Sequence, residues 1–154
     1  GADIFAAKIN IEVQWASEAA IAAVERNGGK ITCAYFDPIS LDALIDPMKF
    51  FERGEPIPKR SFPPMEIIHY YIDPRLRGYL CDPSKLESAK IELSQKYGYK
   101  LPDIRQDPDY DSLFGPSKDP LQVFYGLQPG WVVNMKDSSI LKPKDEDLVS
   151  YYNS

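Results

Sequence analysis

The side chains with the greatest potential for binding are five cations in the middle of the chain, interleaved with prolines and tyrosines. Three lie on a proline-rich stretch and two lie among Tyr70, Tyr71 and Tyr79; the five are Arg53, Lys59, Arg60, Arg75 and Arg77. Such cations pair with phosphates, and aromatic rings stack on unpaired bases. The pattern therefore predicts RNA contacts at these five residues. A second interpretation stays open, in which the tyrosines are core residues and the arginines are solvated or ion-paired.

Catalytic, metal and redox chemistry have little support among the residue types present. His69 is the single histidine, and no nucleophile motif accompanies it. Cys33 alternates within an apolar pattern, as a small buried hydrophobe does, whereas Cys81 precedes a helix start that favours a thiolate only weakly. These three side chains cannot complete a closed four-ligand zinc site without a carboxylate or a partner chain. We therefore expect no enzyme activity, no metal, no cofactor and no small-molecule substrate.

Two short motifs look like binding loops but lack the parts that such loops need. Gly28-Gly29 follows a helical pattern, whereas a phosphate cradle places its glycines before a helix. Asp107, Asp109 and Asp111 alternate without the central glycine and closing glutamate of a calcium loop. The first motif predicts a helix C-cap and the second predicts a solvated acidic turn.

The net charge of -5 is unevenly distributed. Residues 1–48 carry 3 Lys/Arg and 7 Asp/Glu, residues 49–105 carry 11 and 8, and residues 106–154 carry 4 and 8. An acidic protein is not a typical nucleic-acid binder, but the basic middle could face a polyanion. The acidic ends would then face protein or solvent.

Length and composition indicate one ordinary domain, or a small domain with an extension, in 154 residues. The 14 prolines against 9 glycines predict short elements joined by stiff, extended segments. Two widely spaced cysteines favour a reducing compartment. No apolar run approaches the roughly 20 residues that span a bilayer. We expect that any targeting peptide has been removed or lies outside these residues.

The first 37 residues have the clearest pattern. Apolar residues alternate over 8–15, a helix over 18–27 follows Ser17 as its N-cap, and a second strand covers 30–36. This order predicts a crossover unit, right-handed if the two strands are parallel neighbours. The alternation also predicts that Trp15 shares the buried face of the first strand.

The remaining residues predict short helices and extended segments. Ser40 is the expected cap of a helix that ends at Pro47, and residues 53–64 are expected to be extended. Ser84 and Glu87 have capping-box spacing, which opens a helix over 85–97. Further turns are expected after Pro64 and Pro120, with a terminal helix over 144–152.

Several segments resemble one known family. Residues 8–13 and 16–29 are similar to the closing strand and capped, alanine-rich helix of the large-subunit ribosomal protein fifteen family. Segments 50–60, 77–80, 96–99, 124–135 and 140–143 are similar to its mitochondrial form in animals.

The resemblance implies an α+β fold, in which the strand–helix–strand unit of the family domain (1–37) precedes a long, irregular, mostly short-helical, mitochondria-specific extension (38–154). It implies a structural role in the large subunit of the mitochondrial ribosome, in the mitochondrial matrix. The partners would be large-subunit rRNA and neighbouring ribosomal proteins. We expect the chain to be the C-terminal part of such a protein, without the transit peptide and basic glycine-rich arm. Because Glu18 and alanines stand where relatives carry lysines, RNA contacts are not transferred to that helix.

An alternative function is a protein-interaction adaptor. Pro56-Ile57-Pro58 and Phe62-Pro63-Pro64 could serve as ligands of a proline-recognition domain, together with aromatic surface patches.

Overall fold

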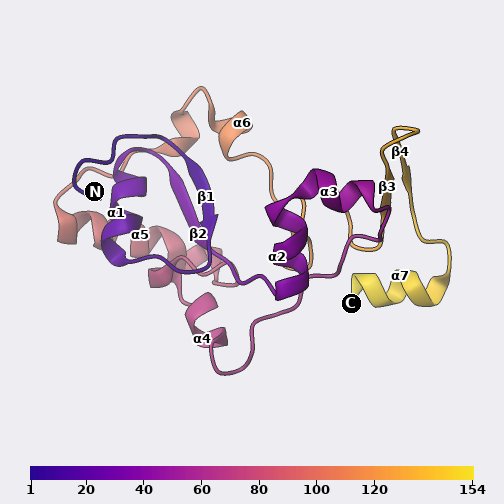
Figure 1. Cartoon of the computed structure of the whole chain (residues 1–154). Coiled ribbons are helices and arrows are strands. Elements are labelled where there is room, and N and C mark those ends of the chain that lie inside the picture. The colour runs from indigo at the N-terminus through magenta and orange to yellow at the C-terminus, as the bar shows by residue number, and fades with distance from the viewer. The chain divides into compact units, whose positions relative to one another are not determined.

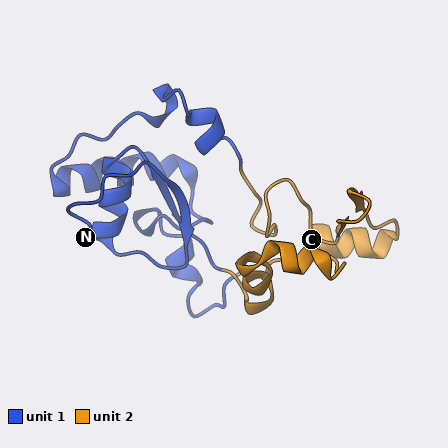
Figure 2. Ribbon diagram, turned by 45° about the horizontal axis from the view of Figure 1, so that its top comes forward, with its two compact units in different colours: residues 1–35, 63–116 blue, residues 36–62, 117–154 orange.

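The computed structural model describes all residues, 1–154, and divides into two compact units (Figure 2). Unit 1 consists of residues 1–35 and 63–116, and unit 2 consists of residues 36–62 and 117–154. Both units therefore contain residues from the predicted extension. The boundary predicted at residue 37 separates a family domain from its extension, which is a different division from that into compact units. That boundary stays a prediction.

Unit 1 contains a two-stranded parallel sheet, with β1 paired to β2 in register from Asn10 with Lys30 to Val13 with Cys33. Helix α1 connects the two strands and contacts both β2 and α5 (Figure 1). This is the predicted strand–helix–strand arrangement. The elements of unit 1 are β1 (Asn10–Val13), α1 (Glu18–Arg26), β2 (Lys30–Cys33), α4 (Ile68–Tyr71), η1 (Pro74–Leu76), α5 (Pro83–Tyr97), η2 (Ile104–Gln106) and α6 (Tyr110–Leu113).

Helix α1 begins and ends where the residue types predict. The Ser17 hydroxyl accepts a hydrogen bond from the Ala20 amide at 3.2 Å, so the predicted N-cap is confirmed. Gly28 ends the helix with φ of +79°, a conformation that glycine adopts without a Cβ clash. At Gly29, an added Cβ would lie 2.5 Å from the Ile9 carbonyl oxygen, so the turn can approach β1 only with glycine there.

The core of unit 1 joins the strand–helix–strand unit to residues from later in the chain. Tyr71 packs edge-on against Tyr35, Tyr70 and Tyr79. The Cys33 amide donates to the Arg77 carbonyl at 2.8 Å, and the Tyr79 amide donates to the Cys33 carbonyl at 2.9 Å. Residues 77–79 therefore add a short backbone bridge beside the end of β2. The buried members of this core are Ala16, Ile21, Ala22, Val24, Ile31, Cys33, Tyr71 and Leu93.

Unit 2 has a smaller core of Ala43, Phe50, Ile57 and Val123. The proline-rich stretch runs through it, because the Ile57 amide donates to the Trp131 carbonyl at 2.9 Å and the Gly130 amide donates to the Ile57 carbonyl at 2.8 Å. Strands β3 and β4 form an antiparallel hairpin (Figure 1). The elements of unit 2 are α2 (Pro38–Ile45), α3 (Pro47–Glu52), β3 (Val132–Asn134), β4 (Ser139–Leu141) and α7 (Glu146–Asn153).

Two predicted caps are wrong. Helices α2 and α5 begin earlier than predicted, with Asp37 and Asp82 as N-caps instead of Ser40 and Ser84. In both helices, proline occupies the first position, where its missing N–H costs nothing and its fixed φ suits the helix. The short helices α3 and η1 start with the same Asp-Pro pair.

Two further differences concern strands. Trp15 lies beyond the end of β1 and is 69% exposed, so the prediction that it shares the buried face is wrong. Strand β4 was not predicted, and it is exposed along its whole length. None of the helices combines the length and the apolar character that crossing a membrane requires.

Candidate nucleic-acid interface

Arg77 is buried in unit 1, at 3% exposure, and forms an ion pair with Glu25 of α1. Its Nε donates to Oε1 of the carboxylate at 2.7 Å, and its Nη2 donates to Oε2 at 3.3 Å. Nη1 donates to the carbonyl oxygens of Pro74 and Arg75 at 2.9 and 3.2 Å. Such a pair is tolerated in a core only when its donors and acceptors are satisfied, as they are here.

The backbone around Arg77 is as constrained as its side chain. Arg77 has φ of 57°, in the left-handed region that residues with a Cβ rarely adopt. The next residue, Gly78, lies against α4, and an added Cβ would collide with the Tyr71 carbonyl group. Arg77 therefore stabilises the contact between α1 and the segment after η1. The Arg77 guanidinium is thus occupied by Glu25 and by two backbone carbonyl oxygens.

Arg60 is buried in unit 2, at 1% exposure. Its guanidinium lies 3.8 Å from the centre of the Phe36 ring, and its Nη1 donates to the Gln122 carbonyl at 3.5 Å. The Lys118 ammonium lies over the same ring at 5.0 Å and over the Tyr125 ring at 4.9 Å. These are cation–π contacts within the unit. Burial therefore argues against an RNA contact for Arg60 as well as for Arg77.

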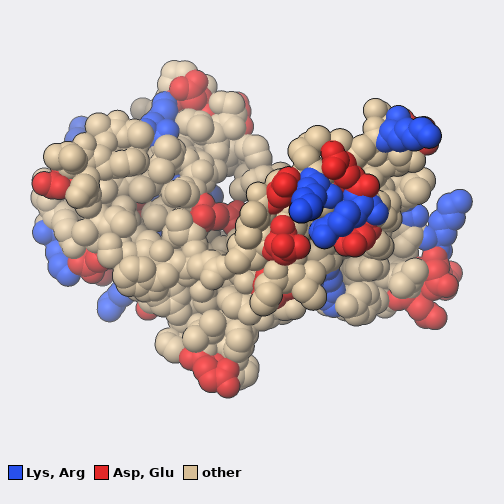
Figure 3. Space-filling model, viewed as in Figure 1, with Lys and Arg blue, Asp and Glu red and all other residues tan.

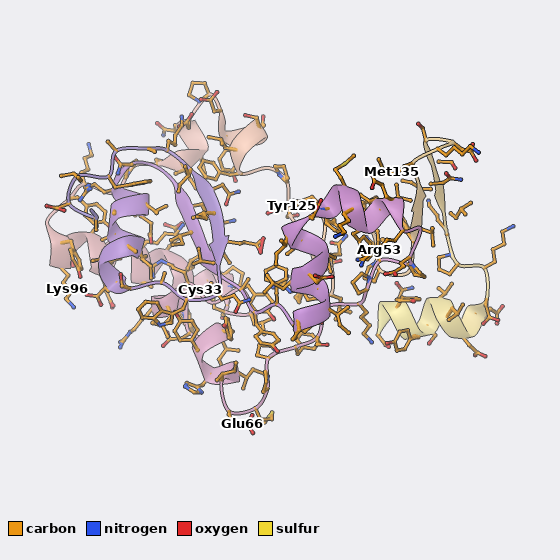
Figure 4. All side chains as sticks on the ribbon, viewed as in Figure 1. Cys33, Arg53, Glu66, Lys96, Tyr125 and Met135 are labelled. Carbon is orange, nitrogen blue, oxygen red and sulfur yellow. The ribbon has the colours of Figure 1, made fainter.

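Arg53 and Lys59 lie nearer the surface of unit 2. Arg53 follows α3, where Figure 4 labels it, and pairs loosely with Asp42 at 3.8 Å and Glu55 at 4.0 Å. The Lys59 ammonium donates to the Tyr151 carbonyl at 3.0 Å and lies 4.7 Å from the centre of that tyrosine ring. Figure 3 shows blue side chains bordered by red ones over α3, so this surface carries both signs of charge.

Arg75 is the remaining predicted contact residue and is exposed on η1 in unit 1. It lines a pocket of about 300 Å³ together with Arg77, Glu18, Glu92 and Lys96. Glu18 and Lys96 form an ion pair, which lowers the pKa of the Glu18 carboxyl and raises the pKa of the Lys96 ammonium. Of the five predicted cations, Arg53, Lys59 and Arg75 are therefore at least partly exposed, and their RNA contacts stay a prediction.

Comparison with known proteins gives the same family as the sequence motifs. The chain is 56% identical over all its 154 residues to "Large ribosomal subunit protein uL15m" of zebrafish, Danio rerio. It spans about half (52%) of that relative's length. The protein of the same name from the fission yeast Schizosaccharomyces pombe is 38% identical over 74 residues, which are 48% of this chain and 28% of the yeast protein. The family model that describes the ribosomal proteins 50S-L15 and 50S-L18e, together with their relative in the 60S subunit, matches residues 1–32.

Across its whole length the chain is therefore similar to a uL15m protein. The resemblance and the α+β fold predicted from the sequence are confirmed. The match of the family model to residues 1–32 covers β1, α1 and most of β2. Residues outside the matched range, among them Tyr71 and Leu93, complete the core around that segment.

The environment of neither cysteine favours a thiolate. Burial raises the pKa of both Cys33 and Cys81, so both thiols are neutral near pH 7. Cys33 is completely buried, as predicted, and Figure 4 labels it at the end of β2; the Tyr70 hydroxyl donates to its Sγ at 3.7 Å. Burial raises the pKa of Tyr70 to about 12.

The acidic turn after η2 has a structural role that its spacing did not indicate. The Lys8 ammonium pairs with Asp107 at 2.8 Å and with Asp109 at 3.2 Å. These contacts lower the pKa of Asp107 and raise the pKa of Lys8. Asp109 is exposed, as predicted for a solvated acidic turn, whereas the side chain of Asp107 is only 18% exposed beside Lys8. No cluster of three or more histidine, cysteine or acidic residues could hold a metal ion, and His69 is exposed on α4.

Sequence reasoning missed the lysine–aromatic contacts of unit 2 and the buried ion pair of unit 1. Lys118, on Phe36 and Tyr125, and Lys142, 4.5 Å from the centre of the Trp131 ring, were not among the predicted contact residues. The Lys-aromatic pairs are not adjacent in sequence, so no local spacing indicates them. The Glu25–Arg77 pair also joins residues 52 positions apart.

Proposed function

We propose that this chain is a structural constituent of the large subunit of the mitochondrial ribosome, located in the mitochondrial matrix and without catalytic activity. The observation that carries the proposal is the 56% identity across the whole chain to the zebrafish uL15m protein. We also propose that residues 38–154 are the mitochondria-specific extension of the family domain. The distribution of those residues over both compact units supports a scaffold role, because they complete a core and add a second one.

The proposed rRNA contacts are made by Arg53, Lys59 and Arg75. Arg53 and Arg75 are exposed and Lys59 is half-buried, and none of the three has a fully enclosed partner. Exposed arginine and lysine side chains can exchange weak surface pairs for phosphate contacts at little cost, since surface ion pairs contribute about 0–1 kcal/mol. Arg60 and Arg77 are excluded from the proposed contacts because they are buried.

The proposed contacts to neighbouring ribosomal proteins use the apolar surface of α2 and α3. Ile39 is 70% exposed, Ile45 is 74% exposed and Met48 is 56% exposed. Large apolar side chains that gather at a surface mark interaction sites when they are contiguous. The adaptor alternative has less support, because Ile57 in the first proline motif is completely buried.

Sedimentation tests the proposed function. Mitochondrial lysate is separated on a sucrose gradient at moderate salt, and the protein is followed by immunoblotting beside a matrix enzyme of similar mass. We expect the protein to sediment with the large subunit while the enzyme stays near the top. RNase treatment should release it or shift it with the degraded particle. The proposal is wrong if the protein never sediments with the large subunit; partners that survive RNase unchanged would favour the adaptor.

A further inference from the structure

Unit 1 contains a second pocket, of about 460 Å³. It is not lined by any of the five residues discussed above as RNA contacts. Its walls are the face of α5 that carries Leu86 and Lys90, the turn between α1 and β2, and residues of the segment 101–110 around η2. Three cations line it, Lys30, Lys90 and Arg105. Leu86 and Ile104 supply apolar surface, and Tyr110 supplies an aromatic ring. The volume lies in the range of small-ligand sites, about 300–1,000 Å³.

The outer wall of this pocket is fixed to the rest of unit 1. Lys8 pairs with Asp107 and Asp109 just after η2. The Asn10 side-chain amide donates to the Leu113 carbonyl at 2.7 Å at the end of α6. These contacts join the segment that follows α5 to β1. The pocket is therefore largely formed before any ligand arrives, which lowers the cost of ordering on binding.

The charges around the pocket favour an anion only slightly, because the three cations exceed the acidic lining residues once the Glu25 carboxylate is paired with Arg77. Of its acidic lining residues, Glu25 is neutralised by Arg77, and the Asp103 carboxylate accepts the Arg105 amide at 3.1 Å as the cap of η2. Glu87 is the third acidic residue and lies exposed. The side chains of Lys30, Lys90 and Arg105 form no ion pair or hydrogen bond within the chain, so their donors are available.

Lys90 is the cation with the strongest need for an anionic partner. It projects from α5, is half-buried and has no hydrogen-bond acceptor within the chain. Burial lowers its pKa, and the nearby carboxylates of Glu25 and Glu87 counteract this only in part. A desolvated ammonium gains more from a phosphate oxygen than an exposed one does, because little water has to be displaced and screening is weak.

We propose that this pocket binds one unpaired nucleotide of RNA, with its phosphate at Lys30, Lys90 and Arg105 and its base against the wall of Leu86, Ile104 and Tyr110. Cations beside apolar and aromatic surface suit the two halves of a nucleotide better than they suit a purely ionic or purely apolar ligand. The proposal deepens the proposed ribosomal function, since it names one kind of RNA element that this chain would hold. It adds a contact on the side of α5 away from η1.

The test is an NMR titration of the ¹⁵N-labelled 154-residue chain with adenosine 5′-monophosphate. We expect saturable shifts confined to residues near 29–30, 86–91 and 101–110. Lys90→Met retains the apolar stem of the side chain and removes the charge, and we expect it to weaken binding by at least about tenfold. Lys85→Met is the matched control, because Lys85 lies on the same helix, is exposed and does not line the pocket; we expect its affinity to stay within about twofold of the parent.

Inorganic phosphate and adenosine are titrated separately, to measure the binding of each half of the nucleotide by itself. We expect each to bind more weakly than adenosine 5′-monophosphate. The melting temperature of Lys90→Met should equal or exceed that of the parent, because a desolvated charge is removed; this separates lost binding from lost folding. The proposal is overturned if the nucleotide causes no saturable shifts, if Lys85→Met weakens binding as much as Lys90→Met, or if phosphate alone binds equally well. If the nucleotide does not bind but the protein sediments with the large subunit, only the nucleotide-binding proposal is wrong. If the nucleotide binds but the protein does not sediment with the large subunit, only the proposed ribosomal role is wrong.

Discussion

The two compact units each bury an arginine, but they stabilise its charge in different ways. In unit 1, the Arg77 guanidinium faces the Glu25 carboxylate, and both side chains are only 2% exposed. In unit 2, the Arg60 guanidinium lies over the Phe36 ring beside Lys118. Unit 1 thus compensates a full charge with a full charge, whereas unit 2 uses the weaker attraction of the Phe36 ring and the Gln122 carbonyl oxygen. The comparison teaches that arginines in a basic stretch can belong to cores and need not face RNA.

The two units also differ in how much of their apolar surface they enclose. Unit 1 combines the segment matched by the family model with tyrosines and α5 from later residues. Unit 2 buries few apolar residues and leaves Ile39, Ile45 and Met48 exposed. Local stability follows buried apolar contact, so we expect unit 2 to open more readily than unit 1.

The largest effect is expected from breaking the buried pair of unit 1. Arg77→Met leaves the Glu25 carboxylate buried without its partner, and we expect a loss of about 3–5 kcal/mol in the free energy of unfolding. Denaturant titration followed by circular dichroism measures it. The double variant Glu25→Leu with Arg77→Met should recover most of the loss. A single variant as stable as the parent would contradict the proposed role of the pair.

A smaller effect is expected from the buried arginine of unit 2. Arg60→Met keeps the apolar stem and removes the guanidinium from Phe36, so we expect a loss of about 1–2 kcal/mol. Hydrogen exchange of amides in residues 36–62 and 117–154 reports this locally. If Arg60→Met costs more than Arg77→Met, the contrast between the two units is wrong.

The next effect concerns the cap of α2 in unit 2. Burial would raise the pKa of the Asp37 carboxyl, but hydrogen bonds from the Ser61 amide and from Ser40 outweigh it, so the pKa is lowered. Because the folded pKa lies below its ordinary value of 3.8, this contribution is complete at neutral pH and is lost as the pH falls below that value. Asp37→Ala should cost about 1 kcal/mol at pH 7.

Measuring Asp37→Ala and the parent across pH 2 to 7 sharpens this prediction. The difference in unfolding free energy should shrink at the acid end, because the parent's carboxylate is then protonated. Ser17→Ala in unit 1 is the matched cap variant whose hydroxyl does not titrate, and its effect should not depend on pH. A constant difference for Asp37→Ala would show that the carboxylate charge is not what caps α2.

The smallest effect is expected at Trp15 of unit 1. Its side chain is 69% exposed, so Trp15→Ala should change the free energy of unfolding by no more than about 0.5 kcal/mol. Thermal unfolding of the two proteins, compared side by side, is sufficient. A loss of unfolding free energy typical of a core tryptophan would contradict this account, and would support the burial of Trp15 that the alternation over 8–15 predicted.

The sequence predicts those features of the fold that depend on neighbours in the chain. The Ser17 cap, the glycine end of α1 and the two short parallel strands follow from residue type and period, and all are observed. The caps of α2 and α5 were misplaced because Ser40 and Ser84, which follow shortly after, are also typical cap residues, and Ser84 has Glu87 at capping-box spacing. The Asp-Pro pairs were the missed signal, since aspartate caps the helix and proline opens it.

The remaining features depend on contacts distant in sequence. Nothing near Arg77 indicates Glu25, and nothing near Arg60 indicates Phe36. The sequence therefore identified a group of cations but could not divide it into buried and exposed members. The hairpin strand β4 was missed because its short, exposed sequence has no period to detect.

The salt dependence of assembly tests the division of the five cations most directly. A tagged chain carrying Arg53→Gln, Lys59→Gln and Arg75→Gln is compared with the parent for association with the large subunit over a range of salt concentrations. We predict an unchanged melting temperature, weaker association, and a shallower slope of log affinity against log salt by about one for each phosphate contact removed. Identical slopes for parent and variant would contradict the assignment of these three side chains to RNA.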